Sequence, residues 1–283
     1  MELHAVDTVD AALDVLAARG DGCQVLAGGT DVMIQLARGE ITPAVLLHVE
    51  RVAGLRGVEA NGSVHLGALV THRTLATGVL GDRFRAVAES AATVGGRQTQ
   101  VVGTIGGNVC NASPAADTLP ALLVHDATVT LRSRAAGRTV PLQEFLVGRR
   151  TTTRAADELL TGVSLGDPGK GSGDVYLKVG RRGAMEVAIV GLAMRLSFDA
   201  AGAVTGARVA LAAVGPRPAR STGAEEALVG GPLEADRLDA AAAAACRDIT
   251  PVDDLRGSAD YRRRVVPGLL RRAAGICARR AGR

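Results

Sequence analysis

Hydrophobic positions in the first 56 residues switch between helical and strand spacing. From Val9 to Arg19 the apolar residues recur every three or four positions, which predicts a helix whose N-cap is Asp7 or Thr8. The other elements expected in this segment are a strand at 24–27, a helix from about 30 to 38 and a strand at 44–49. The pattern therefore indicates a β-turn-α-β unit at the start of the chain.

A second unit follows, with a different pattern. Asn61-Gly62 stands between two apolar runs within residues 58–70, which predicts a β-hairpin closed by a two-residue turn. Residues 97–115 are polar and rich in glycine, so they are expected to form a loop. The remaining expectations are helices at about 71–80, 82–94 and 118–123, a strand at 127–132, and hairpin or loop structure over 133–173.

The clearest linker in the sequence is the run of glycine and polar residues at 166–173. After it, three apolar runs at 174–180, 187–198 and 204–214 predict a meander of three strands, and helices are expected near 222–229, 234–246 and 258–281. We therefore expect an N-terminal domain of residues 1–172, with subdomains of about 1–56 and 57–172, and a C-terminal domain of residues 173–283.

Composition narrows the range of functions. The 283 residues include 47% hydrophobic and 22% charged residues, an ordinary balance for a globular protein. Only five residues are aromatic, which argues against a nucleic-acid-binding module that stacks bases. The net charge of +4 is too small to indicate a polyanionic partner. Neither a signal sequence nor a membrane span is evident, so we expect a cytoplasmic protein.

The reactive side chains show no spacing typical of a metal site. The four cysteines are far apart in the sequence, whereas iron–sulfur clusters and structural zinc need clustered thiolates. The five histidines are interpreted as structural, and no catalytic side chain is assigned. Arginines of the last predicted helix, at 262–264, 271, 272, 279 and 280, are expected to form a solvated face or a docking surface for a partner subunit.

Two glycine-rich segments carry the candidate chemistry. Ala27-Gly28-Gly29-Thr30-Asp31 lies where a strand gives way to a helix, so its backbone N–H groups and the positive end of the helix dipole would suit a pyrophosphate. In the run from Thr104 to Asp117, Gly106 and Gly107 leave one side of the backbone without Cβ atoms, so a phosphate or a flavin ring can approach closely. The alternative is that these glycines only make tight connections.

The two segments together resemble the paired FAD-binding motifs of the medium subunit of molybdenum hydroxylases, the family of carbon monoxide dehydrogenase and xanthine dehydrogenase. The second segment has the pattern TIGGN-x5-P-x2-D, and the resemblance extends over essentially the whole chain. It implies an α+β fold: a two-subdomain FAD-binding domain of the vanillyl-alcohol-oxidase-like (PCMH) type, followed by a C-terminal domain with a three-stranded antiparallel sheet and a helical bundle.

The resemblance also implies the residues that contact the cofactor. Those expected at the FAD pyrophosphate, mainly through backbone amides, are Val25, Leu26, Ala27, Gly28, Gly29, Thr30, Asp31 and Val32. Those expected against the flavin and the pyrophosphate are Thr104, Ile105, Gly106, Gly107 and Asn108. Further contacts are Cys110 near the isoalloxazine edge, the carboxylate of Asp117, the apolar Leu160, Lys178 reaching the flavin from the second domain, and Tyr176 at the ring.

Two positions depart from the family pattern. Many relatives have Gln-Ile-Arg-Asn shortly before the TIGGN segment, whereas this chain has Gln98-Thr99-Gln100-Val101. Where some relatives carry an aromatic contact to the cofactor, this chain has Val94. Both differences bear on the flavin potential and on the choice of electron acceptor.

The function implied by the resemblance is electron transfer. FAD on this chain would receive electrons from [2Fe-2S] clusters on a small partner subunit, while a large subunit with a molybdenum cofactor oxidises the substrate. The subunits would assemble as a dimer of heterotrimers, and the acceptor would be NAD, oxygen or a quinone. Two alternatives remain: a self-contained FAD oxidoreductase with its own small substrate, and a non-catalytic ligand-binding protein.

Overall fold

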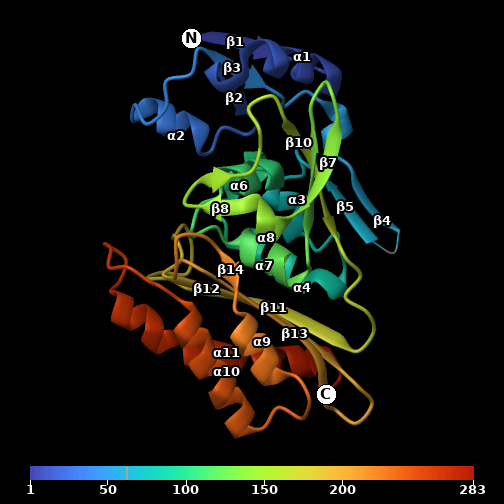
Figure 1. Cartoon of the computed structure of the whole chain (residues 1–283), viewed down its shortest axis with the longest axis vertical. Coiled ribbons are helices and arrows are strands. Elements are labelled where there is room, and N and C mark those ends of the chain that lie inside the picture. Colours follow the sequence, from blue (N-terminus) through green and yellow to red (C-terminus); the bar gives the residue numbers. More distant parts are fainter. Residues whose placement is uncertain (62) are drawn as a thin grey trace.

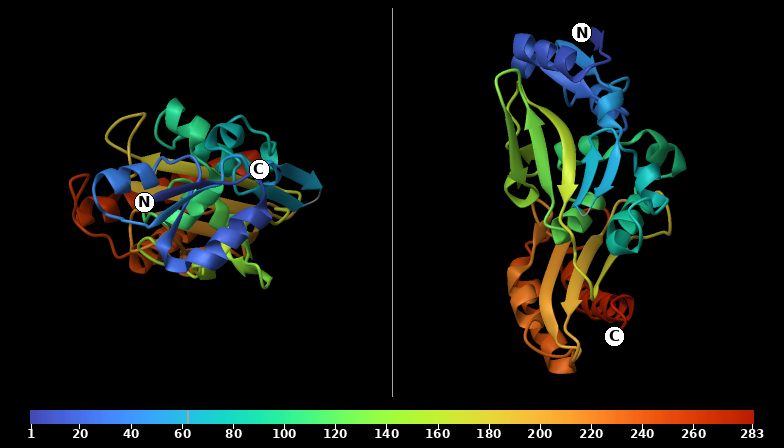
Figure 2. Two further views of the ribbon diagram at one scale, coloured as in Figure 1. Left: turned by 90° about the horizontal axis from the view of Figure 1, so that it is seen from above. Right: turned by 90° about the vertical axis from the view of Figure 1, so that its right-hand side faces the viewer.

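Three sheets stack along the long axis of the molecule in the computed structural model, which describes residues 1–61 and 63–283 (Figures 1 and 2). A three-stranded sheet lies at the N-terminal end, a five-stranded sheet in the middle, and a four-stranded sheet with three helices at the C-terminal end. A separate hydrophobic cluster accompanies each of the three sheets. The mixture of helices and sheets is the α+β class expected from the sequence.

The first sheet is parallel and has the strand order β1-β3-β2. Its elements are β1 (Glu2–Ala5), α1 (Val9–Arg19), β2 (Cys23–Leu26), α2 (Val32–Ala37) and β3 (Val45–His48). Thr8 is the N-cap of α1, because its Oγ1 accepts a hydrogen bond from the N–H group of Ala11 at 3.1 Å. The strand β1 was not expected, because it is only four residues long and largely exposed.

The middle sheet is antiparallel, with the order β4-β5-β10-β6-β7. Its strands are β4 (Val58–Asn61), β5 (Ser63–Gly67), β6 (Thr128–Arg132), β7 (Gly137–Pro141) and β10 (Leu159–Leu165). The expected hairpin is present in β4 and β5, but its turn at Gly62 lies outside the described residues. The central strand β10 was missed, because we expected only hairpin and loop structure over 133–173.

Helices and two short strands surround the middle sheet. They are α3 (His72–Ala76), α4 (Arg85–Ala92), α5 (Arg97–Val102), α6 (Ile105–Asn111), α7 (Thr118–Val124), α8 (Leu142–Phe145), β8 (Leu146–Gly148) and β9 (Thr151–Thr152). The expectation of a loop over 97–115 was therefore wrong, since most of it is helical. Single turns of 3-10 helix lie at Gly20–Gly22, Ala53–Leu55 and Asp82–Phe84, the last at the start of what we expected to be one helix over 82–94.

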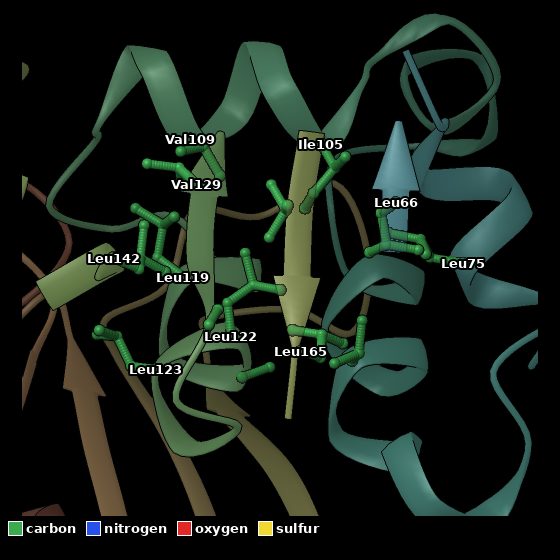
Figure 3. Packing of buried hydrophobic residues seen from close by; sticks show 14 of the residues in the cluster. Leu66, Leu75, Ile105, Val109, Leu119, Leu122, Leu123, Val129, Leu142 and Leu165 are labelled. Atoms are coloured by element: carbon green, nitrogen blue, oxygen red, sulfur yellow. The ribbon is translucent and has the colours of Figure 1, made fainter. Parts of the chain in front are cut away.

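Every residue of α7 is buried. Its leucines pack beside Val129 of β6 and Leu142 in the core of the middle unit (Figure 3). The same helix contacts β12 and β13 of the C-terminal sheet. A buried apolar helix has to be covered on all sides, so α7 joins the two units by packing against both of them.

The C-terminal sheet has the order β11-β12-β13-β14, formed by β11 (Ser172–Val179), β12 (Val190–Phe198), β13 (Val204–Ala212) and β14 (Ala219–Arg220). The three long strands agree with the expected meander. The fourth strand was not expected, because two residues are too few to show an alternating pattern. The helices α9 (Thr222–Leu228), α10 (Ala235–Asp248) and α11 (Ala259–Arg280) complete this end of the molecule.

Buried polar contacts link the C-terminal sheet to the middle unit. The Oδ2 atom of Asp174 accepts a hydrogen bond from the N–H group of Ala86 at 2.9 Å and lies 2.8 Å from Nε2 of His125. From α11, Arg280 donates to the carbonyl group of Asp174 at 2.6 Å, and Arg262 is buried. Two of the arginines expected on a solvated or docking face thus make internal contacts.

Candidate functional site

A cleft of about 850 Å³ opens between the first subdomain and the middle unit. Its walls include the connection from β2 to α2, the start of α6, the 94–96 turn, β10 and the loop at 185–187 from the C-terminal sheet. Both glycine-rich segments line the cleft, although Gly28 and Thr104 are 76 residues apart in the sequence. The cleft is therefore the place where the candidate residues meet.

The first glycine-rich segment presents unpaired backbone donors to this cleft. The N–H groups of residues 28–32 have no hydrogen-bond acceptor within the part of the chain that the structure describes, and all five residues line the cleft. Gly29 has a φ of +73°, a left-handed conformation that favours glycine. A run of amides without acceptors at the start of a helix is a typical anion-binding arrangement, so this segment fits a pyrophosphate.

The second glycine-rich segment differs from the expectation of a loop with free amides. Thr104 is the N-cap of α6, and its Oγ1 accepts from the N–H group of Gly107 at 3.1 Å. The N–H groups of Ile105 and Gly106 donate to the carbonyl groups of Val70 and Ala68, both at 2.9 Å. These donors are already used, so the start of this segment lines the cleft without offering it free backbone donors.

Close packing explains why glycine is needed at Gly106. A Cβ at this position would lie 2.7 Å from the Cβ and from the carbonyl oxygen of Ala68, closer than real Cβ atoms approach such neighbours. In the cleft wall Asn108 is held by α7, because its Oδ1 accepts from the Oγ1 of Thr118 at 2.5 Å. The start of α6 is thereby fixed against Ala68 and α7 and forms one wall of the cleft.

Asp117 is the carboxylate that the sequence analysis assigned to the cofactor, and it lines the cleft while being largely buried. Its Oδ1 accepts from the hydroxyl group of Tyr176 at 2.6 Å, and its Oδ2 from Nζ of Lys178 at 2.8 Å. Lys178 also donates to the carbonyl group of Thr93 at 3.0 Å. Burial raises the pKa of Asp117, whereas the contacts with Lys178 and Tyr176 lower it.

Most of the proposed cofactor residues line the cleft, and a few lie behind its wall. Those that line it are Val25, Ala27, Gly28, Gly29, Thr30, Asp31, Val32, Thr104, Gly106, Gly107, Asn108, Cys110, Asp117 and Leu160. Leu26, Ile105, Tyr176 and Lys178 are outside this set. Ile105 is part of the hydrophobic core, and both Tyr176 and Lys178 reach the cleft only through Asp117.

Burial shifts the pKa of two further ionisable groups in the wall. Burial raises the pKa of Cys110 to about 11, so this thiol remains protonated at neutral pH. Burial also raises the pKa of Asp31, against the opposing effect of nearby Arg150. The thiol of Cys110 therefore acts as a small polar contact rather than as a nucleophile.

Three residues of the cleft wall escaped the sequence analysis. His72 is buried, its Nδ1 has no hydrogen-bond partner among the described residues, and burial lowers its pKa to about 4. Arg150 lies in the tight turn between β8 and β9 with a φ of +53°, and Arg154 follows β9. All three residues are brought to the cleft by tertiary contacts, and no local sequence motif marks them.

The departures from the family pattern have a structural role in this chain. Gln100 belongs to α5, and its Nε2 donates to the carbonyl groups of Ala92 at 2.8 Å and Val94 at 3.1 Å. These bonds hold the turn at 93–96 next to the cleft, and Val94 lines the cleft wall. Gln100 thus fixes the backbone on both sides of the aliphatic Val94 side chain.

Two protein families match the chain. Residues 1–167 match the FAD binding domain in molybdopterin dehydrogenase, and residues 175–275 match the CO dehydrogenase flavoprotein C-terminal domain. Together the two matches cover most of the chain. No helix within the described residues combines the length and the hydrophobicity that crossing a membrane requires.

Relatives and solved structures agree with these matches. The 6-hydroxypseudooxynicotine dehydrogenase complex subunit alpha of Paenarthrobacter nicotinovorans is 31% identical, covering 97% of this chain and 93% of the relative. A putative xanthine dehydrogenase FAD-binding subunit of Escherichia coli is 28% identical, covering 99% and 96%. A carbon monoxide dehydrogenase structure from Hydrogenophaga pseudoflava superimposes with a TM-score of 0.94 at 29% identity, covering 99% of this chain and 98% of that chain.

Proposed function

Because the chain belongs to the family of FAD-binding medium subunits of molybdenum hydroxylases, we propose that it is the electron-transfer subunit of such a complex. It is an oxidoreductase subunit that binds FAD. In the proposal it takes electrons from [2Fe-2S] centres on a small partner subunit and passes them to an external acceptor. A large subunit with the molybdenum cofactor oxidises the substrate, and the assembly is a dimer of heterotrimers.

One observation carries the cofactor part of this proposal: five consecutive residues, 28–32, line the cleft, and their N–H groups have no acceptor among the described residues. A protein rarely leaves five consecutive amides without acceptors unless a ligand or water accepts from them. A pyrophosphate brings the oxygen atoms and the negative charge that such a row binds. Gly107 is exposed in the cleft wall and carries no side chain, which supports a flat ring system as the other part of the same ligand.

FAD, when bound, supplies the ability to exchange electrons one or two at a time. The residues of this chain bind and orient it. Gly28 to Val32 donate backbone hydrogen bonds, and Asp117 offers a carboxylate to a cofactor hydroxyl group. Because the side chains make no covalent bond in this task, no general acid or base is assigned.

The cofactor is tested on the purified chain. Its absorption spectrum is recorded, the protein is denatured by heat, and the released species is identified by mass spectrometry. About one FAD per chain is expected. A folded chain that is colourless and takes up no added FAD contradicts the proposal and favours a ligand-binding protein without flavin.

The relay is tested on the complex purified from the native host through a tag on this chain. Two further subunits containing iron and molybdenum are expected to copurify. Limiting dithionite is then added while the iron–sulfur centres are followed by electron paramagnetic resonance and the flavin by absorbance. Electrons are expected to distribute between both centres within one complex. An isolated chain whose flavin is reduced by its own small substrate would instead identify a self-contained oxidoreductase.

A further inference from the structure

The carboxylate of Asp117 is held from behind by two side chains of a single strand. Tyr176 and Lys178 are both on β11, two residues apart, and so project from the same face of the sheet. The Tyr176 hydroxyl lies 2.6 Å from Oδ1, and Nζ of Lys178 lies 2.8 Å from Oδ2. Each carboxylate oxygen therefore has its own donor from the C-terminal sheet, and each keeps capacity to accept a further hydrogen bond where Asp117 lines the cleft.

Tyr176 is itself fixed on several sides. Its backbone N–H group donates to Oε2 of Glu89 at 2.9 Å, and Glu89 is paired with Arg280 of α11. Next to the ring lies Gly191 of β12, where a Cβ would lie 2.7 Å from the tyrosine hydroxyl oxygen. Because Gly191 has no side chain to fill this space, the tyrosine hydroxyl group can lie beside it and reach Asp117. Nothing in this arrangement places Tyr176 against the cleft itself.

The direction of the hydrogen bond follows from the surroundings. Burial and the neighbouring carboxylate raise the pKa of Tyr176 well above its usual value, so the phenol stays protonated and acts as the donor. The charged or titratable groups in contact with Asp117, within the described residues, are Tyr176 and Lys178, and Glu89 lies behind the tyrosine backbone. Without the phenol, Lys178 would be the one remaining partner, among the described residues, that opposes the effect of burial on the pKa of Asp117.

We propose that Tyr176 is a positioning residue of the FAD site, which keeps the Asp117 carboxylate ionised and aimed at the cleft so that it accepts a hydroxyl group of FAD. This inference rests on the proposed function, since it takes FAD as the ligand. It assigns the C-terminal sheet a part in cofactor binding although Tyr176 does not touch the cleft.

The substitution Tyr176→Phe tests it, because it removes the hydroxyl group and keeps the ring. Apoprotein is titrated with FAD, and binding is followed by quenching of flavin fluorescence. The Kd is expected to rise about tenfold at about pH 8, as for the loss of one hydrogen bond to a charged group. As the pH falls toward about 6, the Kd of the variant rises further, because its Asp117 becomes protonated, whereas that of the wild type changes little.

The matched control is Tyr261→Phe, at the other tyrosine of the chain, which is 42% exposed on α11. It is expected to bind FAD as the wild type does at each pH. A double-mutant cycle separates positioning from a general structural effect. With Asp117→Asn already present, Tyr176→Phe is expected to add little further loss and no pH dependence.

The outcomes are distinguishable. A uniform loss of affinity at all pH values, additive with Asp117→Asn, means that Tyr176 acts only in folding and overturns the inference. Unchanged binding by Tyr176→Phe overturns it as well, while leaving the proposed function in place. If the wild-type apoprotein itself fails to bind FAD, the proposed function fails, and this inference fails with it.

Discussion

The backbone of Gly28 touches the carbonyl group of Val102, so closely that a Cβ at Gly28 would stand 1.7 Å from the carbonyl oxygen. Gly28 belongs to the first glycine-rich segment, and Val102 ends the helix that precedes the second. The two segments are therefore in direct contact. This contact sets the distance between the amides of the first segment and the start of α6.

Substituting Gly28→Ala should force the two segments apart. Because the colliding atoms belong to the backbone, they cannot move aside as a flexible side chain can. We expect the free energy of unfolding in urea to fall by about 1–3 kcal/mol, and the fraction of chains purified with FAD to decrease. The control is Gly54→Ala, where a Cβ meets nothing within 4 Å. Equal FAD content in both variants would show that the contact does not shape the site.

Removing the N-cap of α6 should weaken the same wall of the cleft. Thr104→Val eliminates the Oγ1 that accepts from the N–H group of Gly107, and helix caps of this kind contribute about 1 kcal/mol. We expect thermal unfolding at a lower temperature and weaker FAD binding. Thr104→Ser keeps the hydroxyl group and should retain both properties. If serine and valine behave alike, the effect comes from altered packing at this position and not from the cap.

Arg262 should be important for the stability of the C-terminal sheet although it does not line the cleft. Its Nη1 donates to the carbonyl groups of Ile189 at 2.8 Å and Ala213 at 2.6 Å. Arg262→Met leaves these acceptors without that donor, and we expect a loss of about 3 kcal/mol in the free energy of unfolding. Arg264→Met, at an exposed position of the same helix, should change it little. Similar losses in the two variants would argue against the hydrogen bonds as the cause.

His72 should make stability depend on pH. Its pKa is lowered by burial from 6.5 to about 4, so between these values the unfolded chain binds a proton that the folded chain does not. Above about pH 6.5 His72 is neutral in both states and does not reduce the free energy of unfolding. As the pH falls below this value, the free energy of unfolding decreases, by up to about 3 kcal/mol near pH 4. Protonation favours the unfolded state throughout that window.

The check is urea unfolding of the wild type and His72→Gln at about pH 7.5 and about pH 5. The wild type should lose more stability between the two conditions than the variant, which cannot titrate at this position. His65→Gln, at an exposed histidine, serves as the matched control. A wild type and a His72→Gln variant with the same pH dependence would contradict the assignment.

Much of the fold could be predicted from the sequence, because it depends on local rules. Thr8 as an N-cap, the three long strands after residue 172 and the three final helices follow from hydroxyl side chains and from the spacing of apolar residues. The family pattern in the two glycine-rich segments likewise indicated one cofactor site. Fourteen of the eighteen residues assigned to that site line one cleft, although their roles as FAD ligands stay a prediction.

Other features depend on contacts between distant segments, and only the tertiary structure decided them. Among the described residues, the amides of 28–32 have no acceptor, whereas those of Ile105 and Gly106 are bonded to Val70 and Ala68. Two similar glycine-rich sequences do not reveal this difference. The strand β10 is defined by neighbours on both sides, so its own short pattern was not sufficient. Local sequence determines which backbone conformations are favourable, but the partner of each donor depends on which segments meet. For this reason Tyr176 was expected at the flavin ring and in the structure contacts Asp117.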